Sequence, residues 1–225
     1  MVKNTGLTVW SGGMKEWEEF EPSREMIEDL KVKRAERDRV FRENGIDTKA
    51  LTDFVIGTAE PFSGPVLDIG TGRGLAAVEL ARRGHEVVTI DPDREIVKSA
   101  VANAVAEKVE SLISFNIADV NDIPFEDGSF PLALMINVIH HLDDAANLLP
   151  EVSRVLSPGG RFLFCDFTEK GFEILDRIHG DEGADHSHFS GETVESLAGK
   201  LKDYGMRCIG RDRRHHLELV IAQKS

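Results

Sequence analysis

Three glycines at every second position follow a short apolar segment of this chain. The segment 66–69 contains one acid, Asp68, and runs directly into Gly70, Gly72 and Gly74. The residues that follow have helical character. A strand, a tight glycine turn and a helix in this order are typical of a nucleotide-cofactor crevice at the carboxyl end of a parallel strand. Glycine is needed there because the backbone must turn sharply and lie against a ligand.

Two further acids follow at the ends of the next apolar segments. Asp91 lies about 20 residues after the turn, at the spacing expected for a carboxylate that binds ribose hydroxyls. Asp119 follows a third apolar segment, over residues 112–118. Together with Asp68, these residues predict one crevice lined by acids.

The charge of this crevice distinguishes between two kinds of cofactor. A dinucleotide places an anionic pyrophosphate at the helix N-terminus, where the carboxylate of Asp68 would repel it. S-adenosylmethionine has no phosphate and carries a sulfonium and an ammonium, which acids attract. The spacing of Gly70, Gly72 and Gly74 is also GxGxG and not the GxGxxG of dinucleotide sites.

The sequence resembles the class I S-adenosylmethionine-dependent methyltransferases, in particular the small-molecule branch that includes ubiquinone/menaquinone-biosynthesis-type enzymes. The resemblance covers roughly residues 48–167. Besides the glycine turn, it lies in residues 119–130, which match D-x-x-x-L-P-F-x-D-x-S-F, in 137–142 after the fourth strand, and in 151–161, which match x-x-R-V-L-x-P-G-G. Pro131 replaces the usual Asp, a local change that the start of a strand tolerates.

The resemblance implies a role for each acid of the crevice, although each could also be an ordinary helix cap or loop acid. Asp68 would bind the methionine ammonium, Asp91 would accept two hydrogen bonds from the ribose, and Asp119 would face the adenine amino group. The other expected cofactor-binding residues shape the turn, supply apolar walls or lie at the crevice mouth. The full expected set is Asp68, Gly70, Thr71, Gly72, Asp91, Pro92, Asp119, Val120 and Asn137.

The expected reaction is displacement at the methyl carbon by an acceptor nucleophile, in line with the departing sulfur. Alignment and exclusion of water could supply up to ~7–11 kcal/mol, and a general base is needed only if the nucleophile carries a proton at neutral pH. Candidate bases follow the fourth and fifth strands: His141 is preferred, with His140 and Asp166 beside it. The alternative for His141 is a loop histidine that touches the cofactor.

The segment 168–190 is rich in histidine and acids and is expected to cap the crevice. A metal site formed by His186 and His188 with His179 or Asp181 is the less favoured alternative, because no tight ligand spacing is present. The basic residues 211–216 are expected to form an exposed turn between the last two strands.

The first 47 residues are expected to form an N-terminal arm and a helix. Residues 1–22 hold both tryptophans and could be a lid over the cofactor, or an arm packed on the domain or on a second subunit of a homodimer. Ser23 or Pro22 begins a helix over 23–44, whose charged middle is interpreted as a solvated surface with i,i+4 ion pairs. The alternative is a basic surface for an anionic substrate or partner.

The remaining pattern predicts an α/β fold: a Rossmann-like, seven-stranded, mostly parallel sheet with helices on both faces, after an N-terminal helical extension. The resemblance implies that the last strand is antiparallel. One domain over residues 48–225 is expected, with the cap inserted at about 168–190. The expected elements are a helix over 48–58, then strand 65–69, helix 73–83, strand 86–91, helix 93–107, strand 112–117, strand 130–136, helix 143–156, strand 160–166, helix 191–204, and strands near 206–209 and 216–222.

Composition narrows the function further. The net charge of −13 disfavours a nucleic-acid substrate. No apolar run reaches the ~18 residues of a membrane span, and two cysteines without a signal peptide favour the cytoplasm. We therefore expect a methyltransferase that uses S-adenosylmethionine on a small or medium-sized acceptor. The alternatives are an NAD(P)-dependent oxidoreductase on the same type of sheet and a non-catalytic cofactor-binding module.

Overall fold

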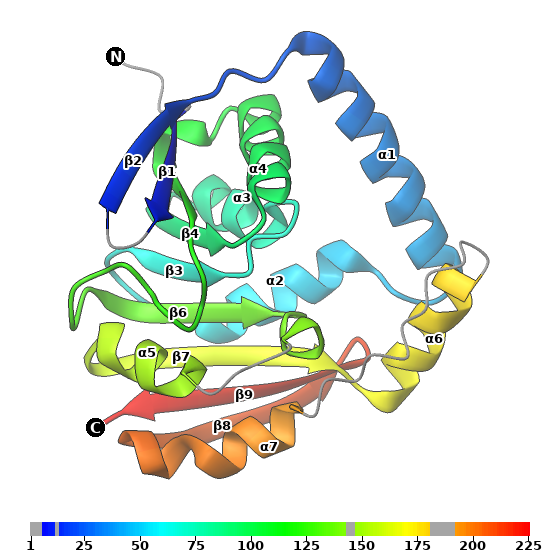
Figure 1. Cartoon of the computed structure of the whole chain (residues 1–225). Coiled ribbons are helices and arrows are strands. Elements are labelled where there is room, and N and C mark those ends of the chain that lie inside the picture. Colours follow the sequence, from blue (N-terminus) through cyan, green and yellow to red (C-terminus); the bar gives the residue numbers. More distant parts are fainter. Residues whose placement is uncertain (1–5, 12–13, 143–146, 181–191) are drawn as a thin grey trace.

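A mixed sheet of nine strands forms the centre of the computed structural model, which describes residues 6–11, 14–142, 147–180 and 192–225 (Figure 1). The strand order is β2-β1-β5-β4-β3-β6-β7-β9-β8. The strands are β1 (Gly6–Ser11), β2 (Met14–Glu19), β3 (Val66–Ile69), β4 (Val87–Asp91), β5 (Ile113–Ile117), β6 (Phe130–Ile136), β7 (Leu156–Phe167), β8 (Met206–Arg214) and β9 (Leu217–Lys224).

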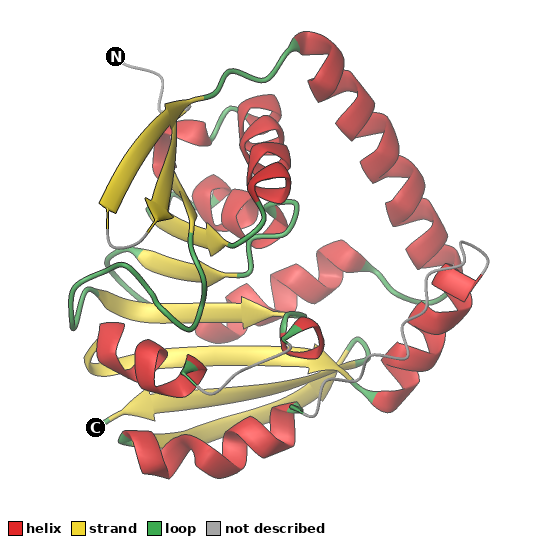
Figure 2. Cartoon of the chain, in the orientation of Figure 1, coloured by secondary structure: helices red, strands yellow, loops and turns green. Residues whose placement is uncertain are grey.

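Helices cover both faces of this sheet (Figure 2). One apolar cluster packs α3 and α4 against the sheet, and a second packs α5 and α7 against the opposite face. The helices are α1 (Arg24–Glu43), α2 (Thr48–Ala59), α3 (Leu75–Arg82), α4 (Arg94–Glu107), α5 (Leu148–Val155), α6 (Glu169–Gly180) and α7 (Val194–Lys200), with short 3-10 turns η1 (Glu110–Leu112), η2 (Ile139–His141) and η3 (Leu201–Tyr204). Within the described ranges, no helix has the length and apolar character required to cross a membrane.

The predicted seven-stranded core is confirmed, and it corresponds to β3 through β9. Strands β5, β4, β3, β6 and β7 are parallel neighbours, and the last strand, β9, runs antiparallel to both β7 and β8. The chain fills one half of the sheet outward from β3 and then returns to fill the other half from β6. In such sheets the ligand crevice lies at the carboxyl ends of the strands where the direction of winding reverses.

The N-terminal segment extends the sheet beyond the seven expected strands. Strand β1 pairs in parallel with β5, with Leu7 opposite Phe115, and β2 pairs antiparallel with β1. Leu7, Thr8 and Val9 are all buried, so this part of the strand is covered on both faces, as an inner strand of a sheet with helices on both sides is. Residues 6–11 and 14–19 are therefore part of the sheet in this structure.

Two segments near the carboxyl terminus have more regular structure than a loop or a turn. The first part of the expected cap is a helix, α6, over residues 169–180. The residues expected to form a turn over 211–216 instead continue β8 as far as Arg214, since Arg211 still pairs with Val220 of β9. Only His215 and His216 make the turn, and both have positive φ angles, of 53° and 63°.

Local capping explains where the first helices begin. The Ser23 hydroxyl accepts a hydrogen bond from the Met26 amide at 3.1 Å, and the Asp47 carboxylate accepts one from the Ala50 amide at 3.0 Å. The predicted starts of these two helices are thus confirmed. Helix α1 has no fully buried residue, so the apolar contribution that usually fixes a helix in place is small here. Figure 1 shows α1 standing apart from the sheet, with its C-terminal end close to α6.

Candidate active site

The glycine turn between β3 and α3 has the shape that the sequence predicts. Gly70 has a φ of 75°, and a Cβ atom there would lie 2.3 Å from Val138 Cγ2, so no other residue fits. The Gly70 amide donates to the Ile90 carbonyl at 2.9 Å, which ties the turn to β4. Gly72 has a φ of 49°, and a Cβ there would meet no atom within 4 Å. The turn is therefore packed on its inner side and open on its outer side.

Asp91, at the end of β4, lies against this turn. Its carboxylate accepts hydrogen bonds from the Gly72 amide at 3.2 Å and from the Asp93 amide at 3.0 Å. A carboxylate has about four acceptor positions, so this one can accept further bonds. Burial raises the pKa of Asp91, and the two amide donors counteract part of that effect. The carboxylate is thus fixed in position and can still accept from a ligand.

Asp68 is the most deeply buried acid of the crevice, with 3% of its surface exposed. The Thr89 hydroxyl donates to its carboxylate at 2.7 Å. Burial raises the pKa of Asp68 to about 7, and the nearby charge of Asp91 acts in the same direction. A cation bound beside Asp68 would offset this effect and favour the ionised carboxylate.

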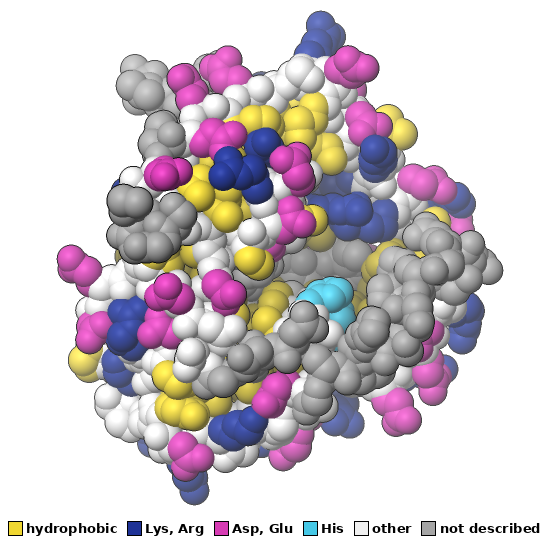
Figure 3. Space-filling view, viewed as in Figure 1, with side chains coloured by type: hydrophobic (Ala, Val, Ile, Leu, Met, Phe, Trp, Pro, Cys, Tyr) yellow, Lys and Arg dark blue, Asp and Glu magenta, His cyan; other side chains and the backbone are white. Residues whose placement is uncertain are grey.

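One cavity of about 890 Å³ collects most of the predicted site residues. Its floor is the carboxyl edge of β3, β4 and β6, and its walls come from α1, α2 and α6. Figure 3 shows this hollow with Lys and Arg side chains on one side and His side chains on the other. The predicted residues that line it are Asp68, Gly70, Thr71, Gly72, Asp91, Pro92, Asn137, His140 and His141.

Two predicted cofactor residues are not brought into this cavity. Asp119 is exposed, and its carboxylate accepts from the Asn121 amide at 2.7 Å as a local turn acid. Val120 is buried, with 9% of its surface exposed, within the apolar cluster that includes Ile123. Both still follow β5 at the same sheet edge, and their contact with adenine stays a prediction.

One buried side-chain oxygen in the cavity lining, that of Asn137, has no hydrogen-bond partner among the described residues. Asn137 has a φ of 56°, and its amide donates to the Cys165 carbonyl at 2.9 Å, so its backbone is fixed. Because buried polar atoms are nearly always paired, this oxygen fits a cavity that receives a polar ligand.

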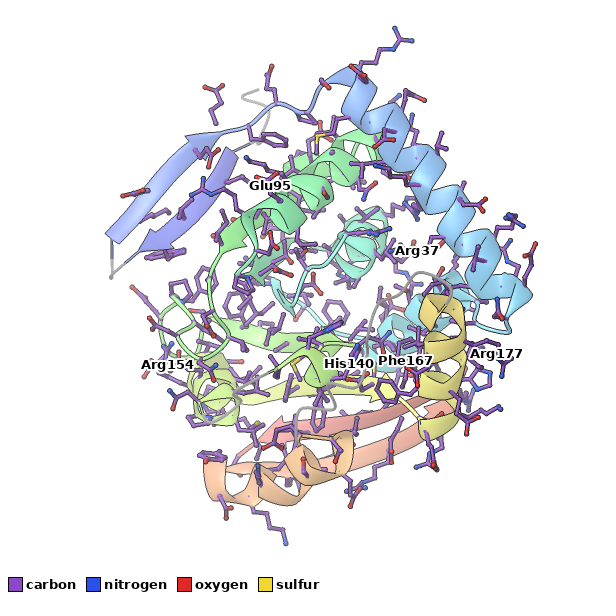
Figure 4. All side chains as sticks on the ribbon, turned by 45° about the vertical axis from the view of Figure 1, so that its right-hand side comes forward. Arg37, Glu95, His140, Arg154, Phe167 and Arg177 are labelled. Carbon is purple, nitrogen blue, oxygen red and sulfur yellow. The ribbon has the colours of Figure 1, made fainter. Side chains whose placement is uncertain are left out.

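A histidine and an aspartate pair at the other side of the cavity. The ring nitrogen Nδ1 of His140 lies 2.8 Å from Asp166 Oδ1, and the His140 amide donates to Asp166 Oδ2 at 3.0 Å. Asp166 also accepts from the Phe167 amide at 2.8 Å and is 4% exposed. A carboxylate on Nδ1 holds the proton there and leaves Nε2 as the acceptor. Figure 4 shows His140 beside Phe167, below α1.

His141, which the sequence analysis preferred as the base, has a different environment. Its ring is exposed and lies 3.9 Å, centroid to centroid, from the ring of His140. Asp166 therefore orients the neighbouring histidine. Strand β7 places Asp166 opposite η2. The contact between Asp166 and His140 therefore depends on the fold and could not be predicted from the order of residues 140 and 141.

Arg154, in the motif segment 151–161, lies outside the cavity and has a structural role. Its guanidinium donates to the carbonyls of Phe125 and Ile123, both at 2.7 Å, and pairs with Asp127 at 2.9 Å. Glu151 pairs with it along α5. This arginine thus holds the loop between β5 and β6 against α5. It joins the motif segments 119–130 and 151–161, which are separate in the sequence.

Arg37 of α1 lines the cavity although the sequence analysis treated it as part of a solvated helix surface. Its Nε and Nη2 atoms are buried and have no hydrogen-bond partner among the described residues. Burial, and to a smaller extent the charge of Arg73, lower the pKa of Arg37 to about 10. Figure 4 shows Arg37 extending from α1 toward the interior.

The metal-site hypothesis concerned side chains that lie outside the described part of the structure, those of His179, Asp181, His186 and His188. In the described residues, no group of three His, Cys, Asp or Glu side chains is placed to hold a metal ion.

Comparisons with known proteins find similarity to methyltransferases. A family model described as methyltransferase domain matches residues 67–164. The chain is 33% identical over 122 residues to the 27-O-demethylrifamycin SV methyltransferase of Amycolatopsis mediterranei, covering 53% of this chain and 45% of that protein. It is 29% identical over 161 residues to the ubiquinone/menaquinone biosynthesis C-methyltransferase UbiE of Desulfotalea psychrophila, covering 63% of each. The matches thus span about half to two thirds of these relatives.

The fold of this chain is also found in solved methyltransferases. The phosphoethanolamine N-methyltransferase 2 of Haemonchus contortus, solved in complex with S-adenosyl-L-methionine, superposes with a TM-score of 0.61 at 19% identity, covering 79% of this chain and 42% of that one. The match at 67–164 contains the glycine turn, Asp91, strand β6 and Asn137, which follows that strand. By sequence, residues 67–164 match the methyltransferase domain family, and by fold the chain is similar to a solved methyltransferase.

Proposed function

We propose that this protein transfers a methyl group from S-adenosylmethionine to a small or medium-sized acceptor. The observation that carries the proposal is the cavity in which the open glycine turn, Asp91 and His140 meet, with His140 held by Asp166. When bound, S-adenosylmethionine would supply a methyl carbon that is already activated by a positively charged sulfur. The cavity volume of about 890 Å³ leaves space for an acceptor beside such a cofactor.

The residues that would hold the cofactor are the acids and the turn. Asp91 would accept the ribose hydroxyls as charge-assisted hydrogen bonds, and Asp68 would attract the ammonium. The open side of Gly72 lets the ligand lie directly on the backbone. The unpaired side-chain oxygen of Asn137 would accept from a donor that faces it.

His140 would serve as the general base if the acceptor nucleophile carries a proton. Asp166 keeps the proton on Nδ1, so Nε2 can accept the acceptor's proton during methyl transfer. For an acceptor that needs no deprotonation, the same pair would only position the substrate. The geometry favours His140 over His141 because Asp166 binds the former.

Binding and turnover separate this proposal from its alternatives. Titration calorimetry with S-adenosylmethionine, S-adenosylhomocysteine and NAD should show binding of the first two only. NAD binding without binding of S-adenosylmethionine would favour the oxidoreductase instead. Transfer of a labelled methyl group to a component of a metabolite extract would then exclude a non-catalytic module.

The role of His140 can be tested once an acceptor is found. His140→Asn should lower kcat by about 10²- to 10⁴-fold and remove the lower limb of the pH–rate profile if it is the base. His141→Asn serves as the matched control, since it changes the adjacent ring. An unchanged pH profile in His140→Asn would contradict the assignment.

A further inference from the structure

The charge spacing along α1 sets Arg37 apart from the other basic residues of this helix. Each other Lys or Arg of the helix has an acid three or four positions away, for example Lys33 with Asp29 and Arg39 with Glu43. These two pairs form at 2.8 Å each. Arg37 instead has Lys33 and Arg34 before it and Val40 and Phe41 after it at those distances. The helix therefore provides it with no acid of its own.

The surroundings of Arg37 in the folded chain do not neutralise it either. Arg73 and Arg34 act on its guanidinium as neighbouring cations, and Asp38 is the single acid among the described residues that acts on it appreciably. Asp38 already accepts from the Thr48 hydroxyl at 3.0 Å and pairs with Arg34 at 3.8 Å.

Arg37 and Arg73 thus form a cationic pair on the wall of the proposed cofactor cavity. Both line the cavity, and neither forms an ion pair within the described ranges. Holding two like charges near each other while burying guanidinium nitrogens costs free energy unless an anion joins them. Guanidinium groups match planar, bidentate anions best.

We propose that Arg37, together with Arg73, forms a binding site for an anionic group of a ligand, a carboxylate or a phosphate, on the wall formed by α1. The identity of that ligand rests on the proposed methyltransferase function. Two sources of the anion are possible: the α-carboxylate of S-adenosylmethionine itself, or an acidic group on the methyl acceptor. In both cases the charge is neutralised inside the cavity, and α1 is drawn onto the ligand.

The first experiment measures cofactor binding by titration calorimetry. The wild type, Arg37→Gln, Arg37→Lys and the control Arg39→Gln are each titrated with S-adenosylmethionine and with decarboxylated S-adenosylmethionine. If the cofactor supplies the anion, Arg37→Gln lowers affinity for S-adenosylmethionine by about 10- to 150-fold, the value of one charged hydrogen bond. Binding of the decarboxylated form should not change, and Arg37→Lys should restore part of the loss.

The second experiment tests the acceptor as the source. The same proteins, saturated with S-adenosylhomocysteine, are titrated with inorganic phosphate and with benzoate. If the acceptor supplies the anion, the wild type binds one of these probes, Arg37→Gln loses that binding, and affinity for S-adenosylmethionine is the same in both. Arg39 lies exposed on the same helix, so Arg39→Gln controls for the loss of one positive charge.

The two proposals fail in different ways. If Arg37→Gln alters neither cofactor affinity nor probe binding, the anion site is wrong while the methyltransferase assignment stands. If the wild type binds no S-adenosylmethionine, the proposed function is wrong. Phosphate binding to the free protein that disappears in Arg37→Gln would still support the anion site in that case.

Discussion

The buried carboxyl of Asp68 should make the stability of this protein depend on pH. Its pKa rises from the ordinary 3.8 to about 7 on folding because the group is removed from water. Each pKa unit is worth about 1.4 kcal/mol, so folding favours the protonated form by about 4 kcal/mol. The substitution to test is Asp68→Asn, which keeps the shape and removes the titration.

The sign of the effect follows from proton binding. Between pH 3.8 and about 7 the folded state holds the Asp68 proton, whereas the unfolded chain has released it. Unfolding therefore releases a proton, and the contribution of Asp68 to the free energy of unfolding falls as pH rises through this window. Above pH 7 both states are ionised and the contribution stays constant. The full contribution, up to about 4 kcal/mol, is present only below the unfolded pKa.

Urea denaturation at pH 5, 6, 7 and 8 measures this directly. The unfolding free energy of Asp68→Asn minus that of the wild type should increase by about 1.4 kcal/mol per pH unit up to pH 7 and then level off. Other titrating groups cancel in the difference. A pH-independent difference for Asp68→Asn would refute the burial argument.

Three further substitutions test the cofactor site and the structure around it. Asp91→Ala should weaken S-adenosylmethionine binding by at least ~1.5–3 kcal/mol in calorimetry, and unchanged affinity would contradict the ribose assignment. Gly70→Ala should lower the unfolding free energy by ~1–3 kcal/mol more than Gly45→Ala. Both glycines have positive φ, but only a Cβ at Gly70 meets Val138, at 2.3 Å; equal losses would exclude this overlap. Arg154→Met should cost ~2–3 kcal/mol in urea denaturation, because it removes the donors to two loop carbonyls; a loss below 1 kcal/mol would mean that the loop holds without them.

The core of the site could be predicted from the sequence because its parts are local or follow from the sheet. The turn from Gly70 to Gly74 depends on backbone angles that only glycine adopts readily, so its residues identify it. Asp91 could be placed beside this turn because adjacent parallel strands end at the same edge. The hydrogen bond from the Gly72 amide to Asp91 is the direct result.

Other parts depend on contacts between distant segments and could not be predicted in the same way. Strand β1 pairs with β5 about a hundred residues later, and nothing near Leu7 specifies that partner. The proposal of His140 in place of His141 as the base rests on Asp166, which contacts one of the two adjacent rings only in the tertiary fold. The sequence does set Arg37 apart, because no acid lies three or four positions from it in the helix. That absence indicates a ligand-binding role only when the structure shows that Arg37 of α1 lines the cavity.

Two sides of the cavity carry opposite charge: the floor at the ends of β3 and β4 is acidic, and the wall formed by α1 is basic. The elements that form these two sides explain the difference. Strand ends can bury carboxylates because nearby backbone amides donate to them, as Gly72 and Asp93 do for Asp91. A helix that stands off the sheet can supply only a long side chain, and Arg37 has the reach to bring a positive charge to the same space. A ligand with charge of only one sign would leave either the acids of the floor or Arg37 of the α1 wall without an opposite charge, at a desolvation cost. A ligand, or a cofactor and acceptor together, with positive groups facing β3 and β4 and a negative group facing α1 satisfies both sides.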